Sequence, residues 1–145
     1  MNAEAIERAL PDDAGEIEEL LKASGLPVEG ASAHLDHFYV ARKGDSIAGV
    51  IGLEPYGEDG LLRSLAVREP DRSKGIGNRL YLHLLGQARL EGIRRLVLLT
   101  TTAEAYFAAR GFRHVPAETI AGPIRQSAEF RGACPSSAAC MELVL

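Results

Sequence analysis

The sequence predicts a single α/β (α+β mixed) domain, built on a mostly antiparallel mixed sheet of six to seven strands with helices on both faces. Its 145 residues are the length of one domain, which we assign to 1–145. Three apolar segments between residues 37 and 67 are separated by glycine-containing turns and indicate an antiparallel run. An apolar residue at every fourth position from Ile76 to Ala88 indicates a helix, and the continuous apolar segment 95–100 indicates a strand covered on both sides.

The first part of the chain is predicted to form a strand over residues 6–10 and then a helix. Asp13 is expected to cap that helix, with Glu16 three residues later completing a capping-box-like pair. The helix is expected to stop near Gly25. Its apolar face would carry Ile17, Leu20 and Leu21.

The remaining elements follow in alternation. Strands are expected over 37–42, 46–53 and 61–67, joined by turns at 43–45 and 55–60. The amphipathic helix would run to residue 91, and a short helix over 103–110 would be closed by Gly111. Residues 112–115 are expected to form a strand, 124–130 a helical segment and 139–145 a last strand. That last strand would be a sheet edge able to pair with another subunit, so a homodimer is one expectation.

Composition and charge argue against several classes of protein. Apolar residues make up 46% of the chain and charged residues 25%, and the net charge of −4 disfavours a nucleic-acid partner. No apolar stretch reaches the ~20 residues of a membrane span, and Met1–Ala5 lacks the basic start of a signal peptide. Cys134 and Cys140 are too few for a disulfide framework, and the four histidines show no metal-ligand spacing. We therefore expect a cytoplasmic protein without a metal.

The loop Arg72-Ser73-Lys74-Gly75-Ile76-Gly77 carries the strongest chemical signal. It precedes the amphipathic helix, whose first turn presents unpaired N–H groups and a positive dipole end to a phosphate. The two glycines let the main chain approach a ligand, and the two cationic side chains would bind a pyrophosphate. The alternative is an ordinary turn with exposed charges. The spacing fits neither a Walker A loop nor a dinucleotide fingerprint.

The loop and its surroundings resemble the GNAT acetyltransferases. Arg72-x-x-Gly75-x-Gly77, after a strand ending Leu65-Ala66-Val67, looks like the family's acetyl-CoA motif, and residues 105–112 look like its second cofactor motif. Residues 61–67, 99–103 and the tail from 124 to 135 are similar to the small GNAT proteins associated with arsenic-resistance operons. The Leu-Thr-Thr stretch at 99–101 also resembles the acetyltransferase domain of N-acetylglutamate synthases.

The resemblance implies an acetyl-CoA site between two strands that splay apart, here 61–67 and 95–100. The main chain of Leu65, Ala66 and Val67 would bind the pantetheine, and an N–H there would polarise the thioester carbonyl. The pyrophosphate would lie on residues 72–77, including Ser73 and Ile76, and Phe107 would pack along the pantetheine. Thr100 would bond cofactor or substrate, or else simply cap the next helix. The substrate amine would attack the thioester directly.

Two departures from the family pattern leave proton transfer open. Many members place a basic carboxylate where this chain has Leu61, and a tyrosine that protonates the thiolate where it has Phe107. Tyr106 is one residue early, about 100° round the helix, so the thiolate could also leave without a positioned acid. Glu54 is the best alternative base, and an exposed glutamate at a strand end is the competing interpretation.

Arg63 is the remaining candidate for a site residue. Strand alternation would place it on one face with Leu61, Leu65 and Val67, where a lone arginine should be paired or line a cleft. It would either anchor a substrate carboxylate or form a salt bridge with a buried acid. Arg125 invites the same two interpretations, or is simply exposed. If both face the cleft, an amino acid or an analogue with an acidic side group would fit.

These observations predict an acetyl-CoA-dependent N-acetyltransferase for the amine of a small molecule, such as an amino acid or glutamate-like analogue. Three alternatives stay open. The chain could be a catalytically silent acetyl-CoA sensor, a peptide or protein N-acetyltransferase, or a phosphate-binding regulatory domain without CoA.

Overall fold

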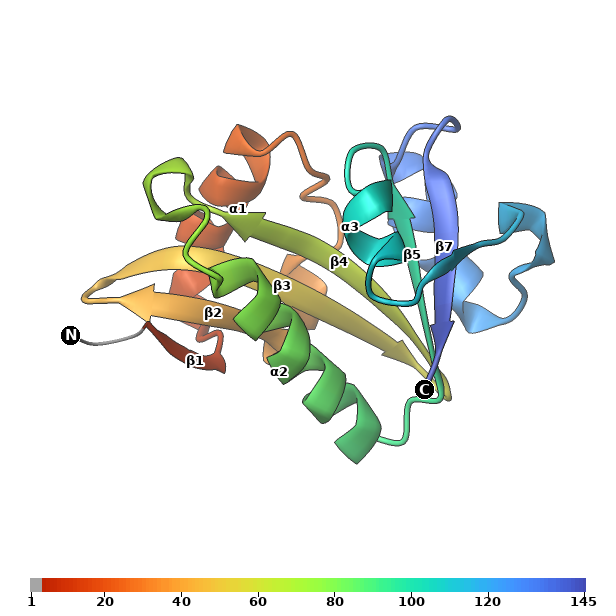
Figure 1. Cartoon of the computed structure of the whole chain (residues 1–145), viewed down its shortest axis with the longest axis horizontal. Coiled ribbons are helices and arrows are strands. Elements are labelled where there is room, and N and C mark those ends of the chain that lie inside the picture. The colour runs from red at the N-terminus through yellow and green to blue at the C-terminus, as the bar shows by residue number, and fades with distance from the viewer. Residues whose placement is uncertain (1–3) are drawn as a thin grey trace.

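A computed structural model describes residues 4–145, which form one seven-stranded sheet in the order β1-β2-β3-β4-β5-β7-β6 (Figure 1). Neighbouring strands are antiparallel except β4 and β5, which are parallel. This confirms the predicted mixed sheet. Residues 1–3, on which the signal-peptide argument partly rests, lie outside the described range. The strands are β1 (Ala5–Arg8), β2 (Phe38–Lys43), β3 (Ser46–Tyr56), β4 (Asp59–Val67), β5 (Arg95–Thr100), β6 (Arg113–His114) and β7 (Ala139–Val144).

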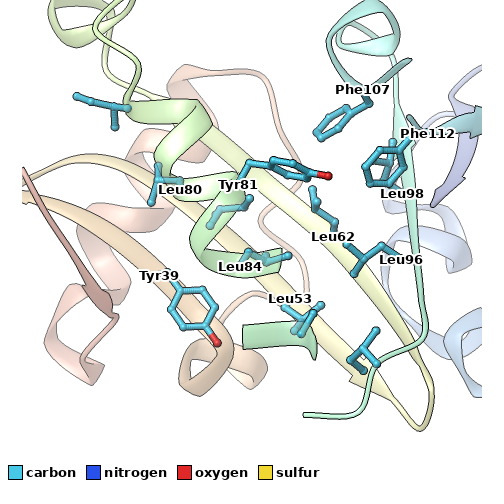
Figure 2. Close-up of a cluster of buried hydrophobic side chains, with 14 of the residues drawn as sticks. Tyr39, Leu53, Leu62, Leu80, Tyr81, Leu84, Leu96, Leu98, Phe107 and Phe112 are labelled. Carbon is cyan, nitrogen blue, oxygen red and sulfur yellow. The ribbon is translucent and has the colours of Figure 1, made fainter. Parts of the chain in front are cut away.

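Helices cover both faces of the sheet, as the sequence predicts. The long helix α2 (Ile76–Leu90) crosses in front of β3 and β4, and α1 (Ala14–Ala23) lies behind them (Figure 1). The short helix α3 (Glu104–Ala108) joins the α2 face, where its Phe107 packs with Leu62, Tyr81 and Phe112 in the largest core cluster (Figure 2). Burial of this apolar surface is the main stabilising term for the fold.

A bulge in β4 changes which side chains face each layer. Ser64 has a φ of 65°, and the β3–β4 register shifts between Val50 and Gly52. Leu61 packs behind the sheet, whereas Leu65 and Val67 pack on the α2 side. Arg63 was expected to share a face with Leu61, Leu65 and Val67. That expectation is wrong for Leu65 and Val67, because the extra residue in β4 reverses the alternation after Arg63.

The hairpin between β3 and β4 is tighter than the predicted turn over 55–60. Tyr56 pairs with Asp59, so only Gly57 and Glu58 form the turn, and Gly57 has a φ of 68°. Positive φ is the conformation that a two-residue hairpin turn requires and that glycine adopts without a steric penalty. The two strands consequently extend to the base of the β4–β5 pairing.

The predicted capping pair at the start of α1 is wrong. Asp13 makes no cap hydrogen bond to the helix, and instead both its carboxylate oxygens accept hydrogen bonds from Arg42 of β2. The Arg42 guanidinium lowers the pKa of the Asp13 carboxyl despite the opposing effect of its burial. Glu16 turns to the sheet, where it accepts from the Ile47 N–H and from Arg68. Tertiary partners thus replace the local cap.

The carboxyl-terminal strand is not the sheet edge that the sequence predicts. β7 pairs with β5 along its whole length, and β6 covers part of its other side through Met141 and Glu142. The edges are β1 and β6, so this argument for a homodimer does not hold. The segment predicted as helical over 124–130 consists of a 3₁₀ turn at Pro123–Gln126 and a π turn at Glu129–Ala133.

None of the helices formed by residues 4–145 combines the length and the apolar composition that a membrane crossing requires. Within the same range, no group of three His, Cys, Asp or Glu side chains is placed to hold a metal ion.

Candidate functional site

The parallel strands β4 and β5 pair at one end only. Their register covers Asp59 to Leu61 against Arg95 to Val97, and beyond these residues the strands separate. Arg95 donates to both carboxylate oxygens of Asp59 at 2.9 Å. This ion pair stabilises the end at which the two strands are paired, called the closed end below. The separation leaves a cleft of about 300 Å³ in the middle of the sheet.

The cleft is lined by the diverging strands and by α3. Its walls are mostly apolar, with a few hydroxyl groups and one guanidinium, a composition typical of a small-molecule site. The strands contribute Leu62, Arg63, Ser64, Leu65, Leu98, Leu99 and Thr100, and the other residues are Leu26, Thr102, Ala103, Tyr106 and Phe107.

The main chain of β4 is available on the cleft side. Ala66 and Val67 pair with Val50 and Gly49 of β3 on one edge, and no β5 residue pairs with them on the other. Peptide N–H and C=O groups on that free edge need partners, because buried backbone groups are costly when unpaired. An extended amide-containing arm, such as pantetheine, would supply such partners.

The loop predicted to hold a pyrophosphate leads directly from β4 into α2. Gly75 is the N-cap of α2 with a φ of 80°, and a Cβ at that position would meet no atom within 4 Å. The first bond along the helix is donated by the Arg79 N–H to the Gly75 carbonyl. The N–H groups of Ile76, Gly77 and Asn78 therefore lack helical acceptors and point out of the helix end, as an anion site requires.

The cationic side chains of this loop are already engaged. The Arg72 Nε donates to the Val67 carbonyl at 3.0 Å, and Lys74 lies 3.3 Å from Asp71. Asp71 is also paired with Lys43 at 2.7 Å, and the two lysines hold the pKa of its carboxyl below the ordinary value. Arg72 and Lys74 are exposed side chains that can exchange these partners for a phosphate at small cost.

Tyr106 and Phe107 both line the cleft. The Tyr106 ring stacks beneath the Arg110 guanidinium, whose Cζ lies 3.5 Å from the ring centroid. Among residues 4–145 the Tyr106 hydroxyl has no hydrogen-bond partner, and burial raises the pKa of that phenol above its ordinary value of 10.0. The group therefore stays protonated at neutral pH. Its oxygen is covered by neighbouring atoms, so it lies behind the surface of the cleft that Tyr106 helps to line.

Arg63 and Glu54 form a buried ion pair. Their side chains are 0% and 1% exposed, and Arg63 Nη1 lies 2.7 Å from Glu54 Oε2. The guanidinium also donates to the Glu29 and Pro27 carbonyls, and its Nε donates to the Ser64 hydroxyl. Of the two interpretations for Arg63, the structure shows pairing with a buried acid, although Arg63 still borders the cleft. The expectation of an exposed Glu54 is wrong, because β3 continues to Tyr56, whose hydroxyl donates to the same carboxylate.

Two other candidates are occupied by local contacts. Arg125 is exposed, and it donates to the Ala117 and Ile120 carbonyls, away from the cleft. It does not face Arg63 across a common site. The Thr100 hydroxyl accepts from the Thr102 and Ala103 N–H groups in the turn before α3, whose N-cap Ala103 has no side-chain cap, and Thr100 still lines the cleft.

Glu129 lies beside Arg63, and no pattern in the sequence predicted a role for it. It is buried in the π turn, with Oε2 3.5 Å from Arg63 Nε. Burial raises the pKa of its carboxyl to about 7, and Arg63 opposes that shift. Nearby Cys134 is a free thiol whose pKa burial raises to about 12. Irregular segments carry no periodicity, so only the tertiary structure could place these two residues.

A second hollow adjoins the cleft. It has a volume of about 340 Å³ and shares Leu26, Leu99, Thr100 and Thr102 with the first. Its outer wall is formed by Pro27, Thr101 and the 133–135 segment. The two hollows therefore lie on either side of shared residues from β5 and the turn after it.

Comparisons with known proteins agree with this geometry. Residues 5–113 match the family described as "Acetyltransferase (GNAT) family". An amino-acid acetyltransferase of Ralstonia nicotianae is 33% identical over 126 residues, which are 81% of this chain and 28% of that protein. One from Pectobacterium carotovorum is 32% identical over 89% of this chain and 31% of its own length. The chain thus spans less than a third of these relatives.

Solved structures show the same fold. N-acetylglutamate synthase from Neisseria gonorrhoeae, complexed with coenzyme A and N-acetyl-glutamate, is 25% identical with a TM-score of 0.82, covering 97% of this chain and 35% of that one. Rv2747 from Mycobacterium tuberculosis, in complex with CoA, is 23% identical with a TM-score of 0.80 over 97% of this chain and 99% of that one.

Proposed function

This chain belongs to the GNAT acetyltransferase family, and on that premise we propose that it transfers an acetyl group from acetyl-CoA to the amine of a small, amino-acid-like molecule. The observation that carries the proposal is the cleft between β4 and β5 together with the path along β4, from which the chain leads into the amino-terminal end of α2. One end of that path offers helix N–H groups for a pyrophosphate, and the other offers free strand amides for an extended arm.

The residues present fit acetyl-CoA. The unpaired N–H groups at 76–78 and the open space around Gly75 suit the diphosphate, with Arg72, Ser73 and Lys74 beside it. The free edge of Leu65, Ala66 and Val67 suits the pantetheine amides, and Phe107 supplies an apolar wall. When bound, acetyl-CoA supplies the activated acetyl group. The protein orients the two substrates and stabilises developing charge.

We propose that proton transfer involves residues other than those usual in the family. Leu61 is fully buried among apolar side chains and supplies no base. Glu54, our first candidate, has its carboxylate oxygens bonded to Arg63 and Tyr56, and it does not line the cleft. Tyr106 is the better supported of the predicted catalytic residues, because it lines the cleft and its buried hydroxyl has no partner among residues 4–145.

For the acceptor we propose an amino acid or glutamate-like analogue. Support comes from the amino-acid acetyltransferases to which the chain is similar. The resemblance of its tail to proteins of arsenic-resistance operons adds phosphinate and arsenical glutamate analogues to the compounds worth testing. A cytoplasmic location and a homodimer stay predictions from the sequence.

The proposal is tested by pairing two glutamate substitutions in α2. Gly77→Glu places a carboxylate in the first turn, where a Cβ has only an ordinary 3.7 Å contact with Val67, and Gly86→Glu places one at an open site in the same helix. Acidic residues near a helix start stabilise the helix, so loss of folding is not expected from Gly77→Glu. We expect the Kd for acetyl-CoA to rise at least tenfold for Gly77→Glu and to stay unchanged for Gly86→Glu.

Catalysis is tested by measuring free-thiol release from acetyl-CoA with a panel of amino acids and analogues. Release with one acceptor, lost in Gly77→Glu, establishes the enzyme. Equal acetyl-CoA binding by both glutamate variants would overturn the assigned cofactor site. Tight binding without release for any amino acid would support the sensor alternative, and release with peptides alone would support peptide acetylation.

A further inference from the structure

Ser64 has an unusual backbone conformation at the point where β4 leaves β5. Its φ of 65° lies in the left-handed region, and it shares that property with only one other non-glycine residue among 4–145, Ser73. Such a conformation strains a residue that has a side chain, and glycine would avoid that strain. The strained residue lies in the cleft wall and carries a hydroxyl, so we ask what that hydroxyl can do there.

The hydroxyl of Ser64 is oriented by Arg63. Arg63 Nε lies 3.0 Å from Ser64 Oγ, and a guanidinium can only donate, so the Ser64 oxygen is the acceptor in this bond. The other guanidinium nitrogens are bound to Glu54 and to the Pro27 and Glu29 carbonyls, which fixes the donor in place. None of these contacts uses the hydroxyl proton of Ser64, which can therefore be donated to a group in the cleft.

Charge strengthens this donor. A hydroxyl that accepts a hydrogen bond from a cation is polarised and becomes a better donor itself. Ser64 is 7% exposed and Arg63 is 3% exposed, so the interaction is weakly screened by water. The cleft at this level is bordered by Leu62 and Leu65, which supply no competing polar group.

We propose that the Ser64 hydroxyl donates a hydrogen bond to the acetyl carbonyl oxygen in the cleft, and that Arg63 is the residue that positions it. The inference rests on the proposed function. As the amine nitrogen bonds to the carbonyl carbon, the π electrons move onto the oxygen, and Ser64 stabilises that charge. The carbon–sulfur bond then breaks with its electron pair on sulfur, the amine loses its proton to water, and Ser64 keeps its own proton.

Two substitutions separate the hydroxyl from the backbone. Ser64→Gly accepts the positive φ without strain, and Ser64→Ala keeps the Cβ, while both remove the donor. We expect kcat to fall on the order of a hundredfold in both, as when one donor to such an oxygen is deleted. The KM for acetyl-CoA should change less than about threefold, and the glycine variant should unfold at a denaturant concentration no lower than the parent.

Ser127→Ala is the matched control. Ser127 is also a buried serine whose oxygen accepts one hydrogen bond, from the Phe130 N–H, and it does not line the cleft. Its kcat should stay within about twofold of the parent. A Ser64→Gly variant with the parent's kcat would overturn the inference.

A second readout is independent of turnover. Infrared difference spectra of bound acetyl-CoA, labelled with ¹³C at the carbonyl, should show a lowered carbonyl frequency that returns toward the solution value in Ser64→Gly. An unchanged frequency in that variant would overturn the inference even in an active enzyme. A carbonyl frequency that changes in Ser64→Gly, in a protein that acetylates no acceptor, would overturn the proposed function. It would still support the hydrogen bond from Ser64 to the acetyl carbonyl. Absence of acetyl-CoA binding by the parent would overturn both.

Discussion

Arg95 donates hydrogen bonds to both carboxylate oxygens of Asp59 at 2.9 Å, at the closed end of the β4–β5 pairing. The Asp59 carboxylate raises the pKa of the Arg95 guanidinium, which stays charged at every accessible pH. A parallel pair only three residues long has few hydrogen bonds of its own, so this ion pair holds the closed end of the cleft.

Replacing Asp59 by Asn should weaken the sheet at this end. Because both side chains are about a quarter exposed, we expect a loss of only about 1 kcal/mol, or roughly 3 °C in Tm. Thermal unfolding followed by circular dichroism measures the change. Glu58→Gln is the control, because its ion pair with Arg94 is almost fully exposed and should contribute nothing measurable. Equal effects of the two substitutions would show that Asp59 has no special role.

Replacing Arg63 by Met should destabilise the fold severely. The substitution leaves the Glu54 and Glu129 carboxylates buried without their cation, which typically costs about 3–5 kcal/mol. Urea unfolding of the parent, Arg63→Met and Arg125→Met measures the difference. Arg125 is exposed, so its variant should lose less than about 1 kcal/mol. Comparable stability of Arg63→Met and the parent would contradict the network described for Arg63.

Stability should depend on pH through Glu129. Its carboxyl has a pKa of about 7 in the folded chain against an ordinary 4.5, so the folded state binds the proton more tightly. Glu129 therefore makes its full contribution to the free energy of unfolding below about pH 4.5. That contribution, on the order of 3 kcal/mol, is lost as the pH rises through about 7. Glu129→Gln should lack this dependence.

The measurement is urea unfolding of the parent and of Glu129→Gln between pH 4.5 and pH 8. Subtracting the two curves cancels the other titrating groups, and the advantage of the Gln variant should grow as the pH rises and level off above about 7. A difference that is constant over this range would mean that Glu129 titrates normally.

Replacing Tyr106 by Phe should separate stability from activity. The hydroxyl has no partner among residues 4–145, so its removal should leave stability unchanged or raise it by up to about 1 kcal/mol. If it protonates the leaving thiolate, kcat should fall on the order of a hundredfold with little change in the KM for acetyl-CoA. Steady-state kinetics with the best acceptor measures the effect. An unaltered kcat would remove Tyr106 from the catalytic set.

Much of the fold follows from local pattern. The pattern from 37 to 67 predicts three strands, and the four-residue spacing in α2 and the apolar run of β5 predict one element each, all from residues close together in the sequence. The glycines before α2 likewise predict an open helix end. The capping pair at Asp13 and Glu16 failed because Arg42 and Arg68, distant in sequence, offered those carboxylates stronger, charge-assisted partners.

The sequence by itself determined the mixed sheet and the loop 72–77 at the start of α2, because periodicity and glycine placement act over a few residues. Only the tertiary structure decided the rest. The bulge at Ser64 reversed the faces of β4, and the pairing of β7 with β5 showed that β7 is not a sheet edge. The ion pairs of Arg63 with Glu54 and Glu129 join residues from three segments that are far apart in the sequence. These outcomes depend on contacts between residues far apart along the chain, where the partner that best satisfies a buried charge or strand edge determines the arrangement.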